Sequence, residues 1–320
     1  MSTDAIIGHT GFVGGTLAQQ HSFSAHFNTS NISDIGCREF DTLVCAAAPG
    51  SMFAANREPQ RDREQINALI ESLKEVRARR FVLISSIAVL ADFAGKDDEG
   101  SKAFQEELAY GRHRRALEAF VEETFEDSLV DRLPALFGRG LRKNFIFDLL
   151  NPIPTMLTEA KLEGLSTVLD PSLFDHLRDL YAPDPSTGMM KLDRAALDDA
   201  PMRASLEEAA ITQGFAATQF HNPETTYQYY NMNRLWSDID IALRAGLRHV
   251  HLVSEPLEAA RIHRRLTGRE MPESGARLHH EDMRTRHAAI WGKQGPYLED
   301  ADTVLDQLAA FYASERRIPS

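Results

Sequence analysis

Cysteine and long apolar runs are both scarce in this sequence, and each absence narrows what the protein can be. Among its 320 residues are two cysteines, Cys37 and Cys45, whose spacing suits neither a metal site nor a redox pair. We expect both to be small, buried, reduced residues of a cytoplasmic protein. No apolar run approaches the roughly 20 residues that span a membrane. The N-terminus leads directly into a short strand-like segment, so we expect neither a membrane span nor a signal peptide.

Positive charge is also in short supply. The 47 acidic residues outnumber the 35 lysines and arginines, which gives a formal net charge of −12. This excess argues against nucleic acid or an anionic membrane as a partner, but a small anionic ligand can still be held by local groups. The adjacent pair His279-His280 has no further ligand at a metal-binding spacing, so we assign no metal.

Glycine is placed where a phosphate site needs it. Gly8, Gly11 and Gly14 follow the apolar run Ala5-Ile6-Ile7 and open a helix-like segment. A strand, a tight glycine turn and a helix N-terminus together favour a pyrophosphate. The spacing is G-x-x-G-x-x-G, which differs from the G-x-G-x-x-G of common dinucleotide folds. We expect the cofactor to contact Gly8, Thr10, Gly11, Phe12, Val13 and Gly14.

The next strand, expected over residues 22–28, should end near the adenosine ribose. An NAD site often places a carboxylate there, and a carboxylate repels the 2′-phosphate of NADP. The stretch 27–31 has no carboxylate, although it also has no Arg or Lys. We therefore favour NADP over NAD, with Asn28 and Ser30 as ribose contacts. Asp34 serves instead if the strand boundary lies a few residues later.

Strands and helices then alternate. Strands are expected at 41–48 and 81–84 and within 130–138, where a strand runs into a loop, with amphipathic helices at 61–80 and 105–123. This alternation predicts an α/β fold, a Rossmann-like doubly wound parallel sheet. We divide the chain into an NAD(P)-binding domain (1–150), an acidic, proline-broken helical cap insertion (151–214) and a smaller C-terminal substrate-binding region with closing helices (215–320). The small residues Ala46, Ala47 and Ala48 at a strand end leave room for the cofactor.

In this order, the pieces resemble the extended short-chain dehydrogenase/reductase family, in particular the branch that modifies nucleotide-activated sugars. The resemblance is carried by the glycine turn, the segment Ala46-Ala47-Ala48, the segment Ser85-Ser86-Ile87-Ala88-Val89, Tyr110 at the start of a helix motif, and the stretch 132–138. It covers residues 1–150 well and 215–320 loosely, and it does not cover the cap.

The resemblance implies hydride transfer at a carbon that bears oxygen. Tyr110 would be the general acid/base, and Ser86 would orient the same oxygen. Ser85 and Pro134 would flank the cofactor. The family has a lysine four residues after the tyrosine, which binds the nicotinamide ribose and lowers the tyrosine pKa. Here that position is Arg114, a planar cation that could still favour a tyrosinate and hold a ribose hydroxyl. Asn67 resembles an asparagine that stabilises this region.

Each of these residues also has an ordinary structural interpretation. Ser86 could cap a turn, and Tyr110 could be a half-buried aromatic with its hydroxyl in water. Arg114 could belong to a solvated face with Arg112 and Arg115. The serine and the tyrosine together are a stronger indication than either alone.

Substrate contacts must come from later segments. We expect Ser86, Asn144 and Tyr229 to contact the substrate. Ser86 is followed by Ile87 and Ala88, not by the Asp-Glu pair of the family's dehydratases. We therefore predict an NAD(P)-dependent reductase or epimerase of a nucleotide sugar, with reduction favoured, and a homodimer formed through the helices at 61–80 and 105–123. The alternatives are a non-catalytic NADP(H) sensor, a partner-binding protein, or a reductase of a non-sugar carbonyl.

Overall fold

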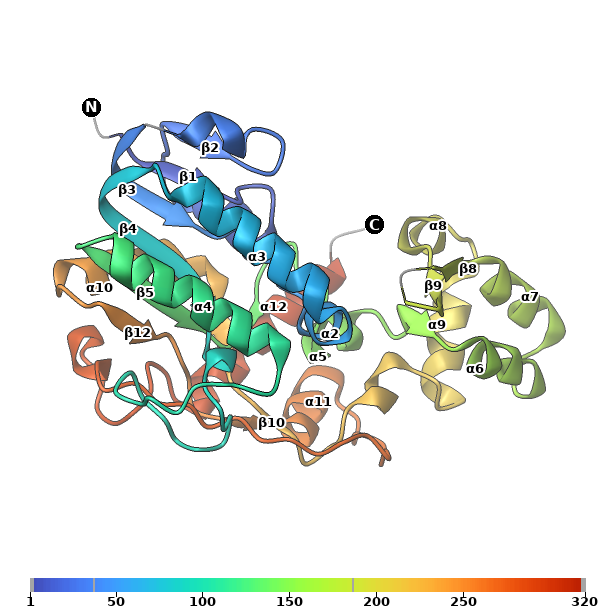
Figure 1. The fold of residues 1–320 in the computed structure, drawn as a ribbon. Coiled ribbons are helices and arrows are strands. Elements are labelled where there is room, and N and C mark those ends of the chain that lie inside the picture. Colours follow the sequence, from blue (N-terminus) through green and yellow to red (C-terminus); the bar gives the residue numbers. More distant parts are fainter. Residues whose placement is uncertain (1–2, 37, 186, 318–320) are drawn as a thin grey trace. The chain divides into compact units, whose positions relative to one another are not determined.

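The computed structural model describes residues 3–36, 38–185 and 187–317, so Cys37 lies outside the described residues. The chain forms two compact units (Figure 1). Unit 1 comprises Met1–Leu141, Thr226–Leu257 and His280–Val304, and unit 2 comprises Arg142–Thr225, Glu258–His279 and Leu305–Ser320. This division differs from the predicted boundaries at 150 and 214. The segments 226–257 and 280–304 belong to unit 1. The first of them supplies a strand to its central sheet, and local sequence patterns do not reveal that pairing.

The centre of unit 1 is a six-stranded sheet in the order β12-β5-β4-β3-β1-β2, in which every paired strand is parallel. Its strands are β1 (Ala5–Ile7), β2 (Ala25–Phe27), β3 (Glu39–Cys45), β4 (Arg77–Ser86), β5 (Ser128–Leu133) and β12 (His249–His251). The predicted doubly wound parallel sheet is confirmed. The order reverses at β1, which lies between β2 and β3. Ligands of such sheets bind at the carboxyl ends of the strands beside this switch point.

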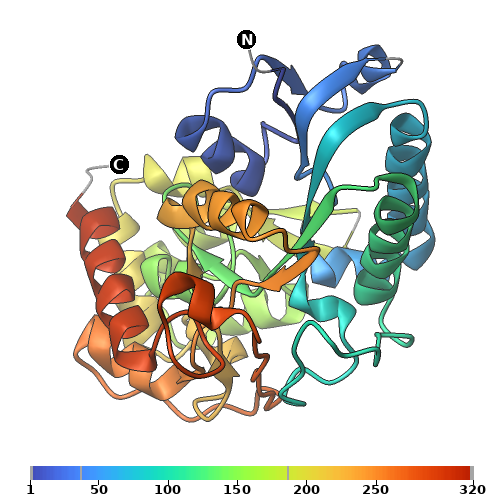
Figure 2. The same ribbon diagram turned by 90° about the vertical axis from the view of Figure 1, so that its left-hand side faces the viewer.

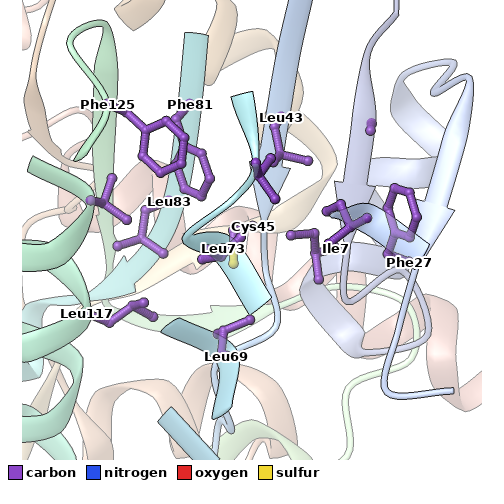
Figure 3. Packing of buried hydrophobic residues seen from close by; sticks show 14 of the residues in the cluster. Ile7, Phe27, Leu43, Cys45, Leu69, Leu73, Phe81, Leu83, Leu117 and Phe125 are labelled. Carbon is purple, nitrogen blue, oxygen red and sulfur yellow. The ribbon is translucent and has the colours of Figure 1, made fainter. Parts of the chain in front are cut away.

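Two apolar layers cover the sheet, one on each face. On one face, α3 (Pro59–Leu73) and α4 (Ala109–Thr124) pack side by side, and Leu69, Leu73 and Leu117 lie against Leu43 and Leu83 (Figures 2 and 3). The other face packs against α1 (Phe12–Gln20) and α10 (Leu235–Arg244). Along β4, Phe81 and Leu83 enter the first layer and Val82 and Ile84 the second, as the two-residue period of a strand requires. The helix predicted at 61–80 ends early because Arg77 already pairs with Glu39 as part of β4.

Shorter elements complete unit 1. They are η1 (Ile32–Ile35), α2 (Met52–Arg57), η2 (Ile87–Val89), β6 (Ala135–Phe137), β10 (Thr226–Tyr227), β11 (Tyr229–Asn231), η5 (Met232–Arg234) and η6 (Ala288–Trp291). β11 pairs with β6 in parallel. β13 (Leu257–Glu258) and α12 (Ala301–Arg317) begin in unit 1 and end in unit 2.

Unit 2 contains the segment predicted as a helical cap, and that description needs correction. The helices are α5 (Phe145–Leu150), α6 (Glu159–Gly164), η3 (Leu165–Thr167), α7 (Pro171–Asp179), α8 (Arg194–Asp198), α9 (Arg203–Thr212), η4 (Ala217–Phe220) and α11 (Ala259–Thr267). They are joined by a three-stranded antiparallel sheet of β7 (Met156–Leu157), β9 (Met189–Leu192) and β8 (Tyr181–Asp184). The strands are too short to show a clear alternation in the sequence. Residues 153–216 form an apolar cluster of their own, which includes Phe174, Leu177 and Leu197.

Within the described part of the chain, none of the helices combines the length and the apolar character needed to cross a membrane.

Candidate cofactor and catalytic site

The glycine turn is built by close backbone packing at the switch point of the sheet. Gly8 follows β1 with φ +91°, in the left-handed region, and its N–H donates to the carbonyl of Phe27 at 2.8 Å. A Cβ on Gly8 would lie 2.4 Å from the carbonyl oxygen of Ala46, and one on Gly14 would lie 2.2 Å from that of Gly8. No side chain fits at either position. Both glycines are therefore required by the fold itself.

Gly11 is different, and this difference bears on whether a dinucleotide fits. A Cβ there would meet only the Gly8 oxygen, at an ordinary 3.4 Å, so the packing of the chain does not explain the glycine. Gly11 and Thr10 are exposed at the start of α1, where no side chain caps the helix and no acidic residue occupies its first turn. A helix leaves the N–H groups of its first turn, here Phe12, Val13 and Gly14, without intrahelical acceptors. The residues present thus fit a pyrophosphate group.

Beyond β2, the chain folds into a local turn. The Asn28 side-chain oxygen accepts hydrogen bonds from the Ser30 backbone N–H (2.8 Å) and hydroxyl (2.6 Å). The Asn31 side chain accepts from the Asn28 N–H at 2.8 Å, and a ring nitrogen of His9 lies 3.0 Å from the Phe27 carbonyl. The predicted ribose contacts Asn28 and Ser30 therefore lie together beside the glycine turn. Their hydrogen bonds to each other stabilise the turn at residues 28–31.

Ser86 and Tyr110 are 24 residues apart in the sequence, and they come together at the end of β4. The Ser86 hydroxyl lies beside the Tyr110 side chain, where it acts to lower the pKa of the phenol, and it accepts the Ala88 N–H at 3.2 Å. The Tyr110 backbone N–H donates to Asn56 Oδ1 at 2.9 Å, which anchors the start of α4 to α2. Ser86 thus does cap a turn, and it also reaches the tyrosine. Gly8, Ala46 and Ser86 each lie at the carboxyl end of a strand of one parallel sheet, so the turn and the pair share one edge.

Arg114 is not part of a solvated face. Its side chain is 2% exposed, and its terminal nitrogens donate to Asp62 at 2.5 and 2.8 Å and also to the Pro49 carbonyl. A ring nitrogen of His113 lies 2.7 Å from the same carboxylate. Burial opposes ionisation of Asp62, but hydrogen bonds from Arg114 and His113 outweigh it and hold the Asp62 pKa below its usual range.

The Arg114 charge acts on Tyr110 in the expected direction, because it lowers the pKa of the phenol. Burial raises the pKa of Tyr110 above its ordinary value, and neither the Arg114 charge nor the Ser86 hydroxyl offsets it. Burial of the phenol is the largest effect, and Asp62, itself only 4% exposed, adds a smaller one that opposes the Arg114 charge. Tyr110 is therefore a protonated phenol over the neutral range.

Ser85 also departs from its predicted role beside the cofactor. It shares a strand face with Phe81 and Leu83, both of which enter the layer under α4. Its hydroxyl donates to Glu118 Oε1 at 2.6 Å. The hydroxyl is thus used inside the protein.

The small residues predicted to line the cofactor and the residues predicted to contact the substrate differ in how much of their surface is accessible. Ala46, Ala47, Ala48 and Pro134 are partly buried at strand ends. Tyr229 is 1% exposed and packs near Phe137, so it presents almost no surface to a substrate. Asn144, in unit 2, has φ +116° and caps α5 by accepting the N–H groups of Ile146 and Phe147 at 3.0 and 3.2 Å.

Two site residues escaped prediction from the sequence. The first is Asn56, whose side chain accepts the Tyr110 backbone N–H. Asn67, the asparagine that was expected to stabilise this region, is exposed on α3. The second is Asp62, which neutralises Arg114. The sequence does contain a signal for this residue, because Asp62 stands four residues before Ile66 on the apolar stripe of α3. An acidic residue on such a stripe needs a buried partner. Across residues 3–36, 38–185 and 187–317, no three His, Cys, Asp or Glu side chains are placed to hold a metal ion.

Comparisons with known proteins establish the fold. No protein-family model and no curated protein matches the sequence. Among solved structures, the chain is similar to dTDP-4-dehydrorhamnose reductase from Bacillus anthracis in complex with NADP (TM-score 0.60, 13% identity, 98% of this chain and 99% of that one). It is also similar to RMD from Pseudomonas aeruginosa complexed with NADPH (0.61, 15%, 99% and 100%). A third is UDP-N-acetylglucosamine 4-epimerase from Methanobrevibacter ruminantium with UDP-N-acetylmuramic acid (0.61, 11%, 98% and 97%).

Proposed function

We propose that this protein is an NAD(P)(H)-dependent oxidoreductase of a nucleotide-activated sugar, and that it reduces a keto group. The observation that carries the proposal is the meeting of Ser86 and Tyr110 on the sheet edge that also bears the glycine turn. A hydride donor held by that turn and a proton donor at the end of β4 are the two components that carbonyl reduction requires.

The chain's own groups would divide the work as follows. The N–H groups at the start of α1 would bind the pyrophosphate, and a nicotinamide dinucleotide bound there would supply the hydride. Ser86 would donate a hydrogen bond to the carbonyl oxygen and orient it. Tyr110 would donate the proton that the same oxygen gains. The raised pKa of Tyr110 suits this role, because only the protonated phenol is a donor.

The structural neighbours support the choice of substrate and cofactor. Two of the three are complexes with NADP or NADPH, and the third is an epimerase in complex with a nucleotide sugar. The neutral turn at 28–31 also favours NADP in this chain, because no carboxylate there repels a 2′-phosphate. The favoured cofactor is therefore NADPH.

The first test is cofactor binding by freshly purified protein. We expect little retained nicotinamide and a fluorescence titration that shows tighter binding of NADPH than of NADH. Retained, non-exchanging NAD would instead indicate an epimerase that recycles its cofactor in place. Binding of neither form would refute the cofactor assignment.

The second test is turnover of nucleotide-linked keto sugars, followed by NADPH absorbance. We expect Tyr110→Phe to lose about 10²–10⁴-fold in kcat while it still binds NADPH. Tyr297→Phe is a matched control, since the Tyr297 hydroxyl contacts Asp282 and not Ser86. NADPH binding without turnover of any keto sugar or other carbonyl would favour the NADP(H) sensor.

We further propose a cytoplasmic homodimer that pairs through α3 and α4. These helices lie side by side, and their outward positions, among them Arg63, Glu64, Gln65 and Ala116, are exposed. A light-scattering mass equal to one chain at every concentration would exclude the dimer.

A further inference from the structure

The residue next to Tyr110 on its helix face is half of a buried ion pair. Arg114 and Asp62 are 2% and 4% exposed, and two nitrogens of the guanidinium bond the two carboxylate oxygens at 2.5 and 2.8 Å. The pair joins α4 to α3 across 52 residues of sequence. Such fork-to-fork geometry is among the strongest that an arginine and a carboxylate form.

The orientation of Arg114 shows how its charge is used. The guanidinium carbon lies 4.0 Å from the centre of the Tyr110 ring, over its face. Its terminal nitrogens are engaged by Asp62, the Pro49 carbonyl and, at 3.3 Å, the Tyr110 carbonyl, while Nε is buried without a hydrogen-bond partner among the described residues. The guanidinium is thus held by α3 and by the backbone.

The polar and charged groups near Tyr110 come from several elements. α4 contributes Arg114 and His113, and α3 contributes Asp62. The end of β4 contributes the Ser86 hydroxyl, and α2 contributes the Asn56 amide. The charges that act on the phenol are therefore chiefly the two members of the ion pair. A cation with an anion less than 3 Å away exerts a much weaker field on a third group than the cation alone does.

On the basis of the proposed function, we infer that Asp62 is a positioning residue which neutralises Arg114, keeps Tyr110 protonated, and so sets the resting protein to accept a carbonyl substrate. An alcohol substrate would require Tyr110 to lose its proton first. Neutralisation of the cation by a residue of another helix is what distinguishes this site from one in which an unpaired cation stabilises a tyrosinate.

The reaction balances in this form. The carbonyl carbon gains the hydride, with its electron pair, from the reduced dinucleotide, and the carbonyl oxygen gains the proton of Tyr110. The C=O double bond becomes a C–O single bond, the dinucleotide is oxidised, and Tyr110 regains its proton from water. The raised pKa of Tyr110 agrees with a phenol that begins each cycle protonated.

A pH titration of tyrosinate absorbance in the ligand-free protein tests the inference without any substrate. The difference between the wild type and Tyr110→Phe isolates the Tyr110 signal. In the wild type, we expect Tyr110 to ionise only above the ordinary pKa range of a tyrosine. In Asp62→Asn, which leaves the cation unpaired, we expect the transition to fall by about 1–2 pH units relative to the wild type.

Three further variants make the result decisive. Asp62→Glu keeps the negative charge and should restore the wild-type titration. Asp41→Asn, a carboxylate removed near exposed Arg79, should leave it unchanged. Because Asp62→Asn strands a buried cation and could unfold, Asp62→Leu combined with Arg114→Met removes both charges. We expect this double variant to fold and to keep Tyr110 protonated.

The contrary outcomes are equally clear. A folded Asp62→Asn protein with an unchanged Tyr110 transition would overturn the inference, as would a double variant in which Tyr110 ionises at lower pH than in the wild type. If keto sugars are turned over, kcat/KM for reduction should stay level up to the Tyr110 transition and fall above it, at lower pH in Asp62→Asn. A shifted titration in a protein without turnover would leave the role of Asp62 standing and refute only the proposed function.

Discussion

Arg132 and Glu118 form a buried pair between β5 and α4, with Nε and Nη2 of the arginine 2.9 and 2.7 Å from the two carboxylate oxygens. They are 2% and 0% exposed. The same carboxylate accepts the Ser85 hydroxyl from β4. Glu118 therefore holds two strands to α4, the helix that carries Tyr110.

We predict that Glu118→Gln destabilises the protein by about 3–5 kcal/mol, because it strands the buried Arg132 charge. Chemical denaturation of the two proteins measures the difference in free energy of unfolding. Replacing both members, with Glu118→Leu and Arg132→Met, should cost much less. Equal losses in the single and double variants would show that packing, not the uncompensated charge, sets the cost.

Ser85 and Ser86 are neighbours in sequence with separate predicted effects. Ser85→Ala should lower stability by about 1 kcal/mol, since Glu118 loses a donor, and should leave catalysis intact. Ser86→Ala should cost about 10²-fold in kcat, through loss of the group that orients the carbonyl, with little change in stability. Denaturation midpoints and keto-sugar turnover, measured on both variants, separate the two roles. The reverse pattern would mean that Ser85 is the residue facing the substrate.

Gly8 and Gly11 should likewise respond differently to alanine. Gly8→Ala places a Cβ 2.4 Å from the Ala46 carbonyl at φ +91°, so we predict a severe loss of stability, more than about 3 kcal/mol. Gly11→Ala meets no such contact and should fold normally. It should bind NADPH more weakly, at least about 10-fold, if the pyrophosphate lies against Gly11. Unchanged NADPH binding in a folded Gly11→Ala protein would argue against the predicted site.

Asp131 makes stability depend on pH. It is fully buried in β5, neither carboxyl oxygen has a hydrogen-bond partner among the described residues, and burial, with a smaller effect of Asp238, raises its pKa well above the ordinary value. The native carboxyl is neutral, whereas the unfolded one ionises above about pH 4. The stabilising contribution of the neutral form is thus complete below about pH 4 and is lost as the pH rises toward the folded pKa.

We therefore predict that Asp131→Leu gains stability relative to the wild type as the pH rises above about 4, by up to about 1.4 kcal/mol per pH unit. Denaturation curves collected from pH 4 to pH 8 measure the slope. Asp41→Asn, at an exposed acid, is the control and should run parallel to the wild type. A pH-independent difference between Asp131→Leu and the wild type would mean that Asp131 is ionised in the folded protein.

Much of the cofactor edge was predictable because it is local. The order of apolar run, glycine turn and helix identified the switch point, and Ser86, predicted to act with Tyr110, lies on the same edge of the sheet. The internal partners of two other residues were not predictable, for a common reason. The spacing of Ser85 and Arg114 resembles that of cofactor contacts, but the partners that engage them, Glu118 and Asp62, lie 33 and 52 residues away.

Local sequence patterns were enough to predict the elements whose signal repeats within a few residues: the parallel strands, their covering helices and the glycine turn, where backbone packing admits no side chain at Gly8. Tertiary structure alone decided which charges compensate each other, which face Ser85 occupies, and that β12 completes the sheet. These outcomes depend on contacts between distant segments, and their energies come from burial and from charge pairing that no local pattern specifies.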